Sequence, residues 1–353
     1  MAFKTSMEEA LRLTRSGNLA EATALLRSAF TRGGAGQAPA PTNKTGGSLL
    51  DLMPESIAFG RAKSPQGQTV DADARFEERS YRGAEGAMDY RLYRPAQAKP
   101  GMPLVVMLHG CTQSPEDFAR GTGMNRLADD LGFLVAYPRQ TQAANAQKCW
   151  NWFKPGDQQR DRGEPALLAG VTRQVIAAES VDPARVYVAG LSAGGAAAAI
   201  MAAEYPDLYA AVGIHSGLAC GAARDLPSAL SAMQRGGGAR AKPGRRFVPV
   251  ITFHGDKDST VNAVNSGEIV AAASAAAPVP LTVRVETGRS PTGRTFTRET
   301  SADPQGTVLI ERWTIAGSGH AWSGGDASGS YTDPSGPDAS REMVRFFLER
   351  TRA

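Results

Sequence analysis

The sequence predicts an α/β fold in which a mostly parallel central sheet is covered by helices on both faces. Six short apolar runs have the length of buried strands, and they lie at 104–110, 132–137, 185–189, 210–215, 247–253 and 308–315. Helix-favouring stretches such as 165–179 come between these runs, and this alternation is typical of parallel sheets with both faces covered. Segments 89–93 and 282–286 alternate apolar and polar residues, so they are expected to be outer strands.

The chain of 353 residues is long enough for one such domain and an appendage. Residues 1–35 predict two short amphipathic helices joined by a tight turn, similar in spacing to half a tetratricopeptide repeat. One such pair cannot build an array, so we expect a helical hairpin that packs on the main domain or on a second copy, giving a possible homo-oligomer. Residues 36–79 are rich in Gly, Pro, Ala and Thr and predict a linker, which leaves 80–353 as the main domain.

Charge and composition disfavour several classes of partner. The chain has 39 basic and 35 acidic residues, an excess too small to indicate nucleic acid binding. Basic residues concentrate at 235–246, where we expect a solvated loop; a lid over a cleft or contact with an anionic surface is the alternative. No stretch approaches the length of a membrane span, and no Gly-rich phosphate loop with its lysine indicates a nucleotide cofactor.

One apolar run leads into the most informative pattern of the chain. The strand at 185–189 is followed by Gly190, Ser192 and Gly194 in the spacing Gly-x-Ser-x-Gly. This turn is so tight that the residues two before and two after the serine must be nearly free of side chain, and it exposes the serine hydroxyl at the strand tip. The alanine-rich stretch 193–205 favours the helix that should follow. Ser192 is therefore the predicted nucleophile.

A nucleophilic serine needs a base, and a carboxylate that orients the base. The histidines of the chain are at positions 109, 215, 254 and 320. In α/β-hydrolases the order along the chain is serine, acid, histidine, which excludes His109. Carboxylates follow the run 247–253, and only His320 lies beyond them. Asp258 is the predicted acid because it lies farther out in the loop, and Asp256 is the alternative.

The oxyanion hole is expected in the loop that follows an earlier strand. The run 104–110 predicts a buried strand that ends at a glycine. The backbone N–H groups of Cys111 and Ala193 are therefore the candidates to bind the oxyanion. Cys111 is a weak candidate for a thiol nucleophile, because no neighbouring residue in the sequence would lower the pKa of its thiol.

Several motifs then carry a family resemblance. They are His109-Gly-Cys-Thr-Gln113, the runs 149–153 (Cys-Trp-Asn-Trp-Phe) and 163–164 (Gly-Glu), the elbow at 190–195, the run 319–325 (Gly-His-Ala-Trp-Ser-Gly-Gly) and the tail 329–338. As a set, they closely resemble the short-chain-length polyhydroxyalkanoate (PHB) depolymerase esterases, secreted-type α/β-hydrolases related to feruloyl and acetylxylan esterases. The resemblance covers the main domain and implies the triad Ser192, Asp258 and His320. It does not fix the substrate.

The resemblance also suggests a disulfide between Cys111 and Cys149, with Cys220 left as a free buried thiol. Such a bridge would stabilise the fold by roughly 3–4 kcal/mol on the chain-entropy model. A disulfide and the family both indicate an extracellular protein. Residues 1–30 contain no apolar signal core, however, so a cytoplasmic location is the alternative.

Taken together, the sequence predicts a serine carboxylic ester hydrolase that works through an acyl-enzyme and needs no metal or cofactor. The expected partner is an ester or polyester-oligomer substrate, and short-chain hydroxyalkanoate esters are favoured. Feruloyl or acetyl esters are the main alternative, and a binding protein on an inactive hydrolase scaffold is a more remote one. Trp152, Trp322 and Tyr331 are candidates to line the substrate cleft, with core packing as the alternative for Trp152.

Overall fold

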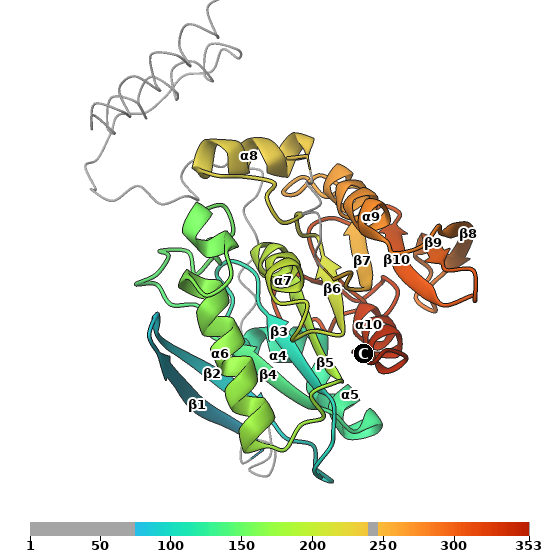
Figure 1. The fold of residues 1–353 in the computed structure, drawn as a ribbon. Coiled ribbons are helices and arrows are strands. Elements are labelled where there is room, and N and C mark those ends of the chain that lie inside the picture. The colour runs from blue at the N-terminus through green and yellow to red at the C-terminus, as the bar shows by residue number, and fades with distance from the viewer. Residues whose placement is uncertain (1–74, 239–245, 353) are drawn as a thin grey trace, which may run out of the picture. The chain divides into compact units, whose positions relative to one another are not determined.

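A computed structural model describes residues 75–238 and 246–352, and Figure 1 shows how these residues are arranged. The predicted hairpin at 1–35 lies outside the described residues, together with any contact that it makes with a second copy. The predicted linker lies outside them up to residue 74, and so do residues 239–245 of the basic loop.

The described residues form a large sheet whose strand order is β1-β2-β4-β3-β5-β6-β7-β10-β9-β8. The strands are β1 (Phe76–Gly83), β2 (Gly86–Tyr93), β3 (Leu104–Leu108), β4 (Leu134–Pro138), β5 (Val186–Leu191), β6 (Ala211–His215), β7 (Val250–Gly255), β8 (Thr282–Arg289), β9 (Thr295–Ala302) and β10 (Val308–Ile315). The six central strands, β4-β3-β5-β6-β7-β10, pair in parallel. The outer strands β1 and β2 on one side, and β9 and β8 on the other, pair antiparallel. A second, small sheet pairs β11 (Trp322–Ser323) with β12 (Thr332–Asp333).

Helices cover both faces of the large sheet (Figure 1). They are α4 (Pro115–Thr122), α5 (Met124–Leu131), α6 (Gly163–Ala178), α7 (Ala193–Glu204), α8 (Leu226–Arg235), α9 (Val264–Ala276) and α10 (Ala339–Leu348), with a short 3₁₀ turn at Pro155–Gln158. Successive side chains of a strand point to opposite faces, so Val186 packs in the core beneath α6 to α9, and Tyr187 packs in the core beneath α4, α5 and α10. The predicted fold class is confirmed.

Each predicted apolar run overlaps one of the parallel strands, and 89–93 and 282–286 fall in β2 and β8. The expected start of the domain at residue 80 is late, because β1 already begins at Phe76 and pairs along its whole length with β2. This edge strand is highly charged. Its Arg79, for example, forms an ion pair with Glu179 at 2.7 Å, so the strand lacks the apolar pattern by which the inner strands were found.

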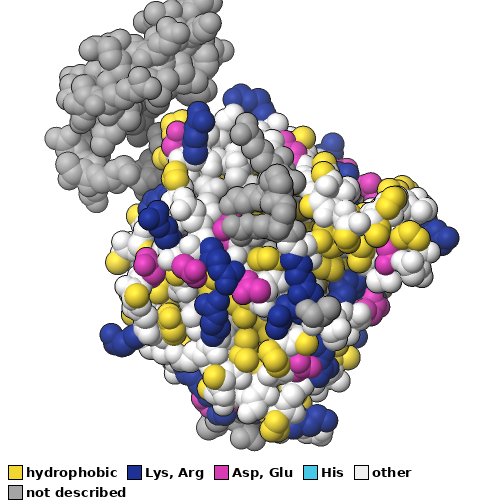
Figure 2. Space-filling view, in the orientation of Figure 1, with side chains coloured by type: hydrophobic (Ala, Val, Ile, Leu, Met, Phe, Trp, Pro, Cys, Tyr) yellow, Lys and Arg dark blue, Asp and Glu magenta, His cyan; other side chains and the backbone are white. Residues whose placement is uncertain are grey.

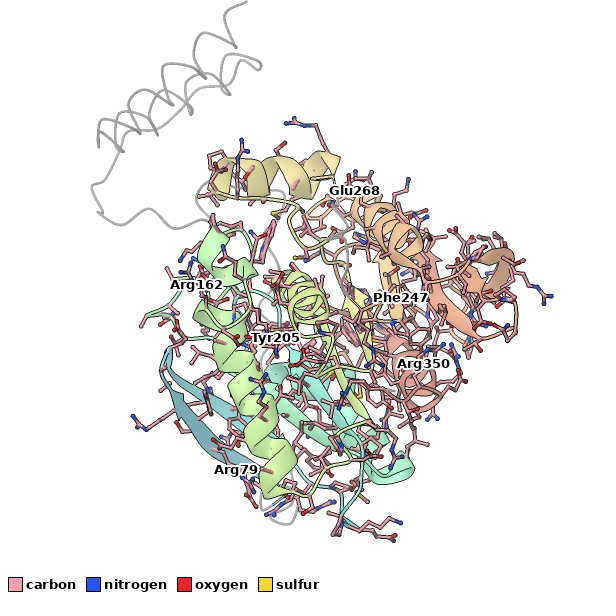
Figure 3. The ribbon with its side chains drawn as sticks, in the orientation of Figure 1. Arg79, Arg162, Tyr205, Phe247, Glu268 and Arg350 are labelled. Atoms are coloured by element: carbon pink, nitrogen blue, oxygen red, sulfur yellow. A yellow bond between two sulfur atoms is a disulfide. The ribbon has the colours of Figure 1, made fainter. Side chains whose placement is uncertain are left out.

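The segment that leads into α6 is attached to the end of α7. Tyr205, labelled in Figure 3, accepts a hydrogen bond from the Asp161 N–H at 2.7 Å. The guanidinium carbon of Arg160 lies 4.7 Å from the centre of the Tyr205 ring, and Arg160 also makes a two-pronged ion pair with Asp207. These contacts fix the position at which α6 begins.

Basic and acidic side chains are intermingled on the face of the molecule drawn in Figure 2, and no histidine is visible on that face. Three of the four histidines have essentially no exposed surface, namely His109, His215 and His254. Within the described ranges, none of the helices combines the length and apolarity needed to span a bilayer.

The strand order changes direction at β3, which lies between β4 and β5. The chain leaves β3 towards one side to reach β4, and it later returns to the other side of β3 to form β5. Loops after two such strands diverge at the carboxyl edge of the sheet and leave a crevice, which is where α/β folds bind their ligands. The loop after β3 contains Cys111, and the turn after β5 contains Ser192.

Candidate active site

The turn between β5 and α7 has the strained geometry of a nucleophile elbow. Ser192 has φ 57° and ψ −120°, a conformation that side-chain-bearing residues rarely adopt. A Cβ atom added to Gly190 would lie 2.3 Å from the Gly194 carbonyl oxygen, and one added to Gly194 would lie 2.0 Å from the Leu108 carbonyl oxygen. Both positions therefore require glycine. The Ser192 N–H donates to the His215 carbonyl at 2.9 Å, and Ser192 remains partly exposed.

Asp258 and His320 lie together at the same edge of the sheet. His320 Nδ1 is 2.7 Å from Asp258 Oδ2, while the other carboxylate oxygen accepts hydrogen bonds from the Thr260 and Val261 N–H groups at 2.9 and 2.8 Å. A carboxylate can only accept, so the hydrogen of the His320 ring is on Nδ1. The other ring nitrogen, Nε2, is then left with a lone pair that can accept a proton.

The surroundings of Asp258 keep it ionised. Burial alone would raise the pKa of this carboxyl, but contacts with His254 and His320 hold the pKa well below its usual value. His254 Nε2 lies 3.4 Å from the Asp258 carboxylate and donates to the Val261 carbonyl at 2.7 Å. No role for His254 was predicted from the sequence. The feature of the sequence that could have indicated this contact is the four-residue spacing between His254 and Asp258 at the end of a strand.

Asp256, the alternative acid, has a different place. Its side chain is exposed and accepts a hydrogen bond from the Gly317 N–H at 2.7 Å, while its own N–H donates to the Ile315 carbonyl. Asp256 therefore holds the start of the loop that carries His320, and Asp258 is the carboxylate that contacts the histidine ring.

The contact between Ser192 and His320 is not formed in the structure. The Ser192 hydroxyl makes no hydrogen bond to any described residue. The structure thus joins the predicted acid to the predicted base and leaves the predicted nucleophile at the elbow. Contacts between a nucleophile and its base are often long without substrate and shorten in the reacting complex.

The loop after β3 presents the Cys111 N–H without an acceptor in the part of the chain that the structure describes. The Gly110 N–H donates to Gln113 Oε1 at 2.8 Å, the Thr112 N–H to the Gln147 carbonyl at 2.6 Å, and the Gln113 N–H to the Gly110 carbonyl at 3.4 Å. The Cys111 N–H has no acceptor among the described residues, and neither has the Ala193 N–H at the start of α7. Cys111 and Ala193 are the two residues whose N–H groups the sequence predicts as oxyanion donors.

His109 fixes the peptide that carries the Cys111 N–H. Its Nδ1 donates to the Gly110 carbonyl at 2.8 Å, and its Nε2 accepts from the Gln140 N–H at 3.2 Å. Burial lowers the pKa of His109 to about 4, so the ring is neutral at physiological pH. The Gly110 carbonyl and the Cys111 N–H belong to one planar trans peptide, and holding the first therefore orients the second.

A disulfide joins Cys111 to Cys149, as the resemblance suggested. It ties the loop after β3 to the segment that follows β4. On its other side, Gln113 Nε2 contacts Asp117 and the Ser330 carbonyl at 3.0 and 3.1 Å. Cys220 is outside the disulfide, as expected, but the residue is partly exposed and not buried as predicted.

The predicted cleft residues need correction. Trp152 packs in the core edge-to-face with Phe153, which was the alternative considered for it. Trp322 is 1% exposed, and it stacks on His215 and donates to Ser340 Oγ at 3.0 Å. Its place beside His320 in the sequence gave no information on where its side chain points, and the structure does not support a cleft role. Tyr331 is half-buried and its hydroxyl lies 3.0 Å from Thr112 Oγ1, beside the loop after β3.

This arrangement of sheet, elbow and loops defines the class of the protein as an α/β-hydrolase. A solved structure with the same fold, the acetyl xylan esterase from Aspergillus awamori, has a TM-score of 0.57 at 19% identity, covering 74% of this chain and 94% of that chain. The family model described as Esterase PHB depolymerase matches residues 88–277. The chain belongs to this family.

Three curated proteins with similar sequences are named as a depolymerase or as esterases. The chain is 35% identical over 240 residues to poly(3-hydroxyalkanoate) depolymerase C of Paucimonas lemoignei, covering 64% of this chain and 56% of that protein. It is 33% identical over 139 residues to feruloyl esterase B of Thermothelomyces thermophilus, covering 39% and 47%. It thus spans about half the length of these two relatives. The putative esterase NocK of Nocardia uniformis subsp. tsuyamanensis is 29% identical over 316 residues, covering 82% and 83%. These names confirm the predicted class, carboxylic ester hydrolase, at the level of the family.

The two carboxylates of the loop after β7 should respond differently to substitution. Asp258→Asn should lower kcat by roughly ten-thousand-fold, because an amide that donates to Nδ1 would favour the wrong tautomer of His320. Asp256→Asn should lower kcat by less than about tenfold, because its oxygen can still accept from the Gly317 N–H. Steady-state kinetics on a soluble ester, with thermal unfolding as a check on folding, would measure both. A reversed ranking would refute the assignment.

Removing the disulfide should affect both stability and turnover. The bridged cysteines are 38 residues apart, so the double variant Cys111→Ala/Cys149→Ala should lose roughly 3–4 kcal/mol of unfolding free energy. Its kcat should also fall, because the Cys111 N–H becomes less well fixed. Urea unfolding and kinetics would test this, with Cys220→Ala as the control that retains the bridge. A double variant as stable and as active as the wild type would contradict the prediction.

Proposed function

We propose that this protein hydrolyses carboxylic esters with Ser192 as nucleophile, His320 as general base and Asp258 as the orienting carboxylate. The observation that carries the proposal is the contact between the Asp258 carboxylate and His320 Nδ1 at 2.7 Å, at the same edge of the sheet as the elbow serine. This contact supports a base with its free nitrogen available and its positive charge offset once it is protonated.

The reaction follows from these roles. His320 Nε2 takes the proton of the Ser192 hydroxyl as the serine oxygen attacks the ester carbonyl. The oxyanion that forms would be bound by the Cys111 and Ala193 N–H groups, which have no acceptor among the described residues. The protonated histidine gives its proton to the leaving alcohol, and an acyl group remains on Ser192. A water molecule that His320 deprotonates then attacks the acyl-enzyme and restores the serine.

We propose short-chain hydroxyalkanoate esters and oligomers as the substrate class. The longer of the two alignments with named substrates is to the poly(3-hydroxyalkanoate) depolymerase, over 240 residues, against 139 residues to the feruloyl esterase. The second of these similarities supports a feruloyl ester as the alternative, and a similarity to an acetylxylan esterase of Coprinopsis cinerea, 28% identical over 162 residues, supports an acetyl ester. The disulfide supports an oxidising compartment, so we propose that the protein works outside the cytoplasm.

Ser192→Ala should abolish ester hydrolysis and leave the fold intact, since the hydroxyl forms the covalent bond and fills little space. An active-site serine reagent should label Ser192 in the wild type and nothing in the variant. Intact-protein mass spectrometry and circular dichroism would measure the label and the fold. Full activity in the alanine variant would overturn the mechanism.

The substrate class should be visible in a direct comparison. Soluble 3-hydroxybutyrate trimer and p-nitrophenyl butyrate should be cleaved with a kcat/KM at least about tenfold above that for methyl ferulate, which corresponds to about 1.4 kcal/mol of transition-state stabilisation. Product release measured by chromatography would decide. A preference for methyl ferulate or acetylated xylan would favour the alternative, and Ser192→Ala supplies the background rate for every substrate.

A further inference from the structure

A carboxylate outside the proposed triad connects the two segments behind the loop after β3. Glu164 lies in the first turn of α6. One of its oxygens accepts from Gln140 Nε2 and from Asn151 Nδ2, both at 2.5 Å, and the other accepts from the Asn151 N–H at 2.7 Å. All three partners are donors, so the interactions are those that a carboxylate makes best.

Both segments that Glu164 contacts are linked to the Gly110–Cys111 peptide, one through His109 and the other through the disulfide. Gln140 donates through its backbone N–H to His109 Nε2 at 3.2 Å, and His109 in turn holds the Gly110 carbonyl at 2.8 Å. Asn151 lies two residues after Cys149, which is bridged to Cys111. The Gln140 side chain also donates to the Cys149 carbonyl at 3.2 Å, so the two routes meet beside the disulfide.

We propose that Glu164 is a positioning residue for this loop: it clamps the Gln140 and Asn151 segments together and thereby fixes the direction of the Cys111 N–H. The inference rests on the proposed ester hydrolysis, because the Cys111 N–H matters only if an oxyanion forms. Glu164 itself contacts no reacting atom. Its effect should therefore appear in the stabilisation of the transition state rather than in the binding of substrate.

Opposing effects act on the pKa of the Glu164 carboxyl. Burial and the neighbouring Asp157 raise the pKa of its carboxyl to about 7, against the lowering effect of the hydrogen bonds from Asn151 and Gln140. Asp157 also accepts from the Glu164 N–H at 2.9 Å, which keeps the two carboxylates close together. Protonation would place a hydrogen against groups that can only donate, so the clamp is strongest when Glu164 is ionised.

The first test is the kinetics of Glu164→Gln on p-nitrophenyl butyrate above pH 8, where the wild-type carboxyl is ionised. The glutamine has nearly the same shape, but its NH₂ group faces at least one donor. We expect kcat to fall on the order of 10- to 100-fold with KM changed less than about twofold, since a misdirected oxyanion donor affects only the transition state.

Glu311→Gln is the matched control. Glu311 is a fully buried carboxylate of β10 that accepts from Arg298, Trp313 and Arg345, and none of these contacts leads to the loop after β3. This variant should lower the melting temperature and leave kcat within about twofold. If Glu164→Gln behaves in the same way, with a lower melting temperature and an unchanged kcat, Glu164 is only structural and the inference is wrong.

A second variant covers the case in which Glu164→Gln does not fold. Gln140→Ala removes the side chain that Glu164 holds and leaves the disulfide in place. Its kcat should fall as well. Where Glu164→Gln does fold, the double variant should lose less than the sum of the two single losses, since both changes break one connection. A kcat within twofold of the wild type for Gln140→Ala would also overturn the inference.

Amide hydrogen exchange separates this inference from the proposed function. If the wild type cleaves no ester, or if Ser192→Ala cleaves it equally well, the proposed function fails and the kinetic readout is lost. Peptides from 104–118 should still exchange faster in Glu164→Gln than in the wild type, while peptides from 308–323 should not change. Unchanged exchange at 104–118 would refute the clamp whatever the activity.

Discussion

The close approach of the turn after β5 to the end of β3 is the constraint on which the candidate site depends. A side chain at Gly194 would collide with the Leu108 carbonyl, so the two backbones meet with no side chain between them. The pairing of β3 with β5 runs up to Leu108 and Gly190, and the elbow therefore cannot move away without breaking the sheet. This contact sets the Ser192 backbone and the loop that contains Cys111 side by side at the switch point of the sheet.

Buried histidines connect the loops at this edge. His215 is the last residue of β6, and its Nε2 accepts from the Ser323 N–H at 2.9 Å, which ties β6 to the loop that follows His320. Burial holds the pKa of His215 well below its usual value, with the nearby histidines acting in the same direction. Burial also lowers the pKa of His109, which lies behind the loop after β3. A neutral imidazole donates at one nitrogen and accepts at the other, so it can join two backbone segments in a fixed direction without adding charge beside Asp258.

The sequence was sufficient for the parts of the structure that local pattern determines. The parallel strands were predictable because they are apolar on both faces. Strand β1 at one edge of the sheet and β9, next to the opposite edge strand, carry charged residues and were missed. Helix α4 was also missed, although Ser114 caps it and Pro115 opens it, which is a recognisable start signal. Contacts such as that of His215 with the Ser323 N–H depend on how segments distant in the sequence meet, and no local pattern reports them.

The loop after β3 is held more tightly than its sequence suggests. Thr112 has φ 66°, which is unfavourable for a residue with a branched side chain, so the loop needs external support to keep this conformation. That support comes from separate directions: the disulfide, the Gln147 carbonyl, and the hydrogen bond of Gln113 to Asp117 of α4. A donor that is already fixed stabilises a developing negative charge without the free-energy cost of reorganising during the reaction. The rigidity of this loop is therefore part of the chemistry that the site supports, although none of the supporting side chains takes part in bond formation.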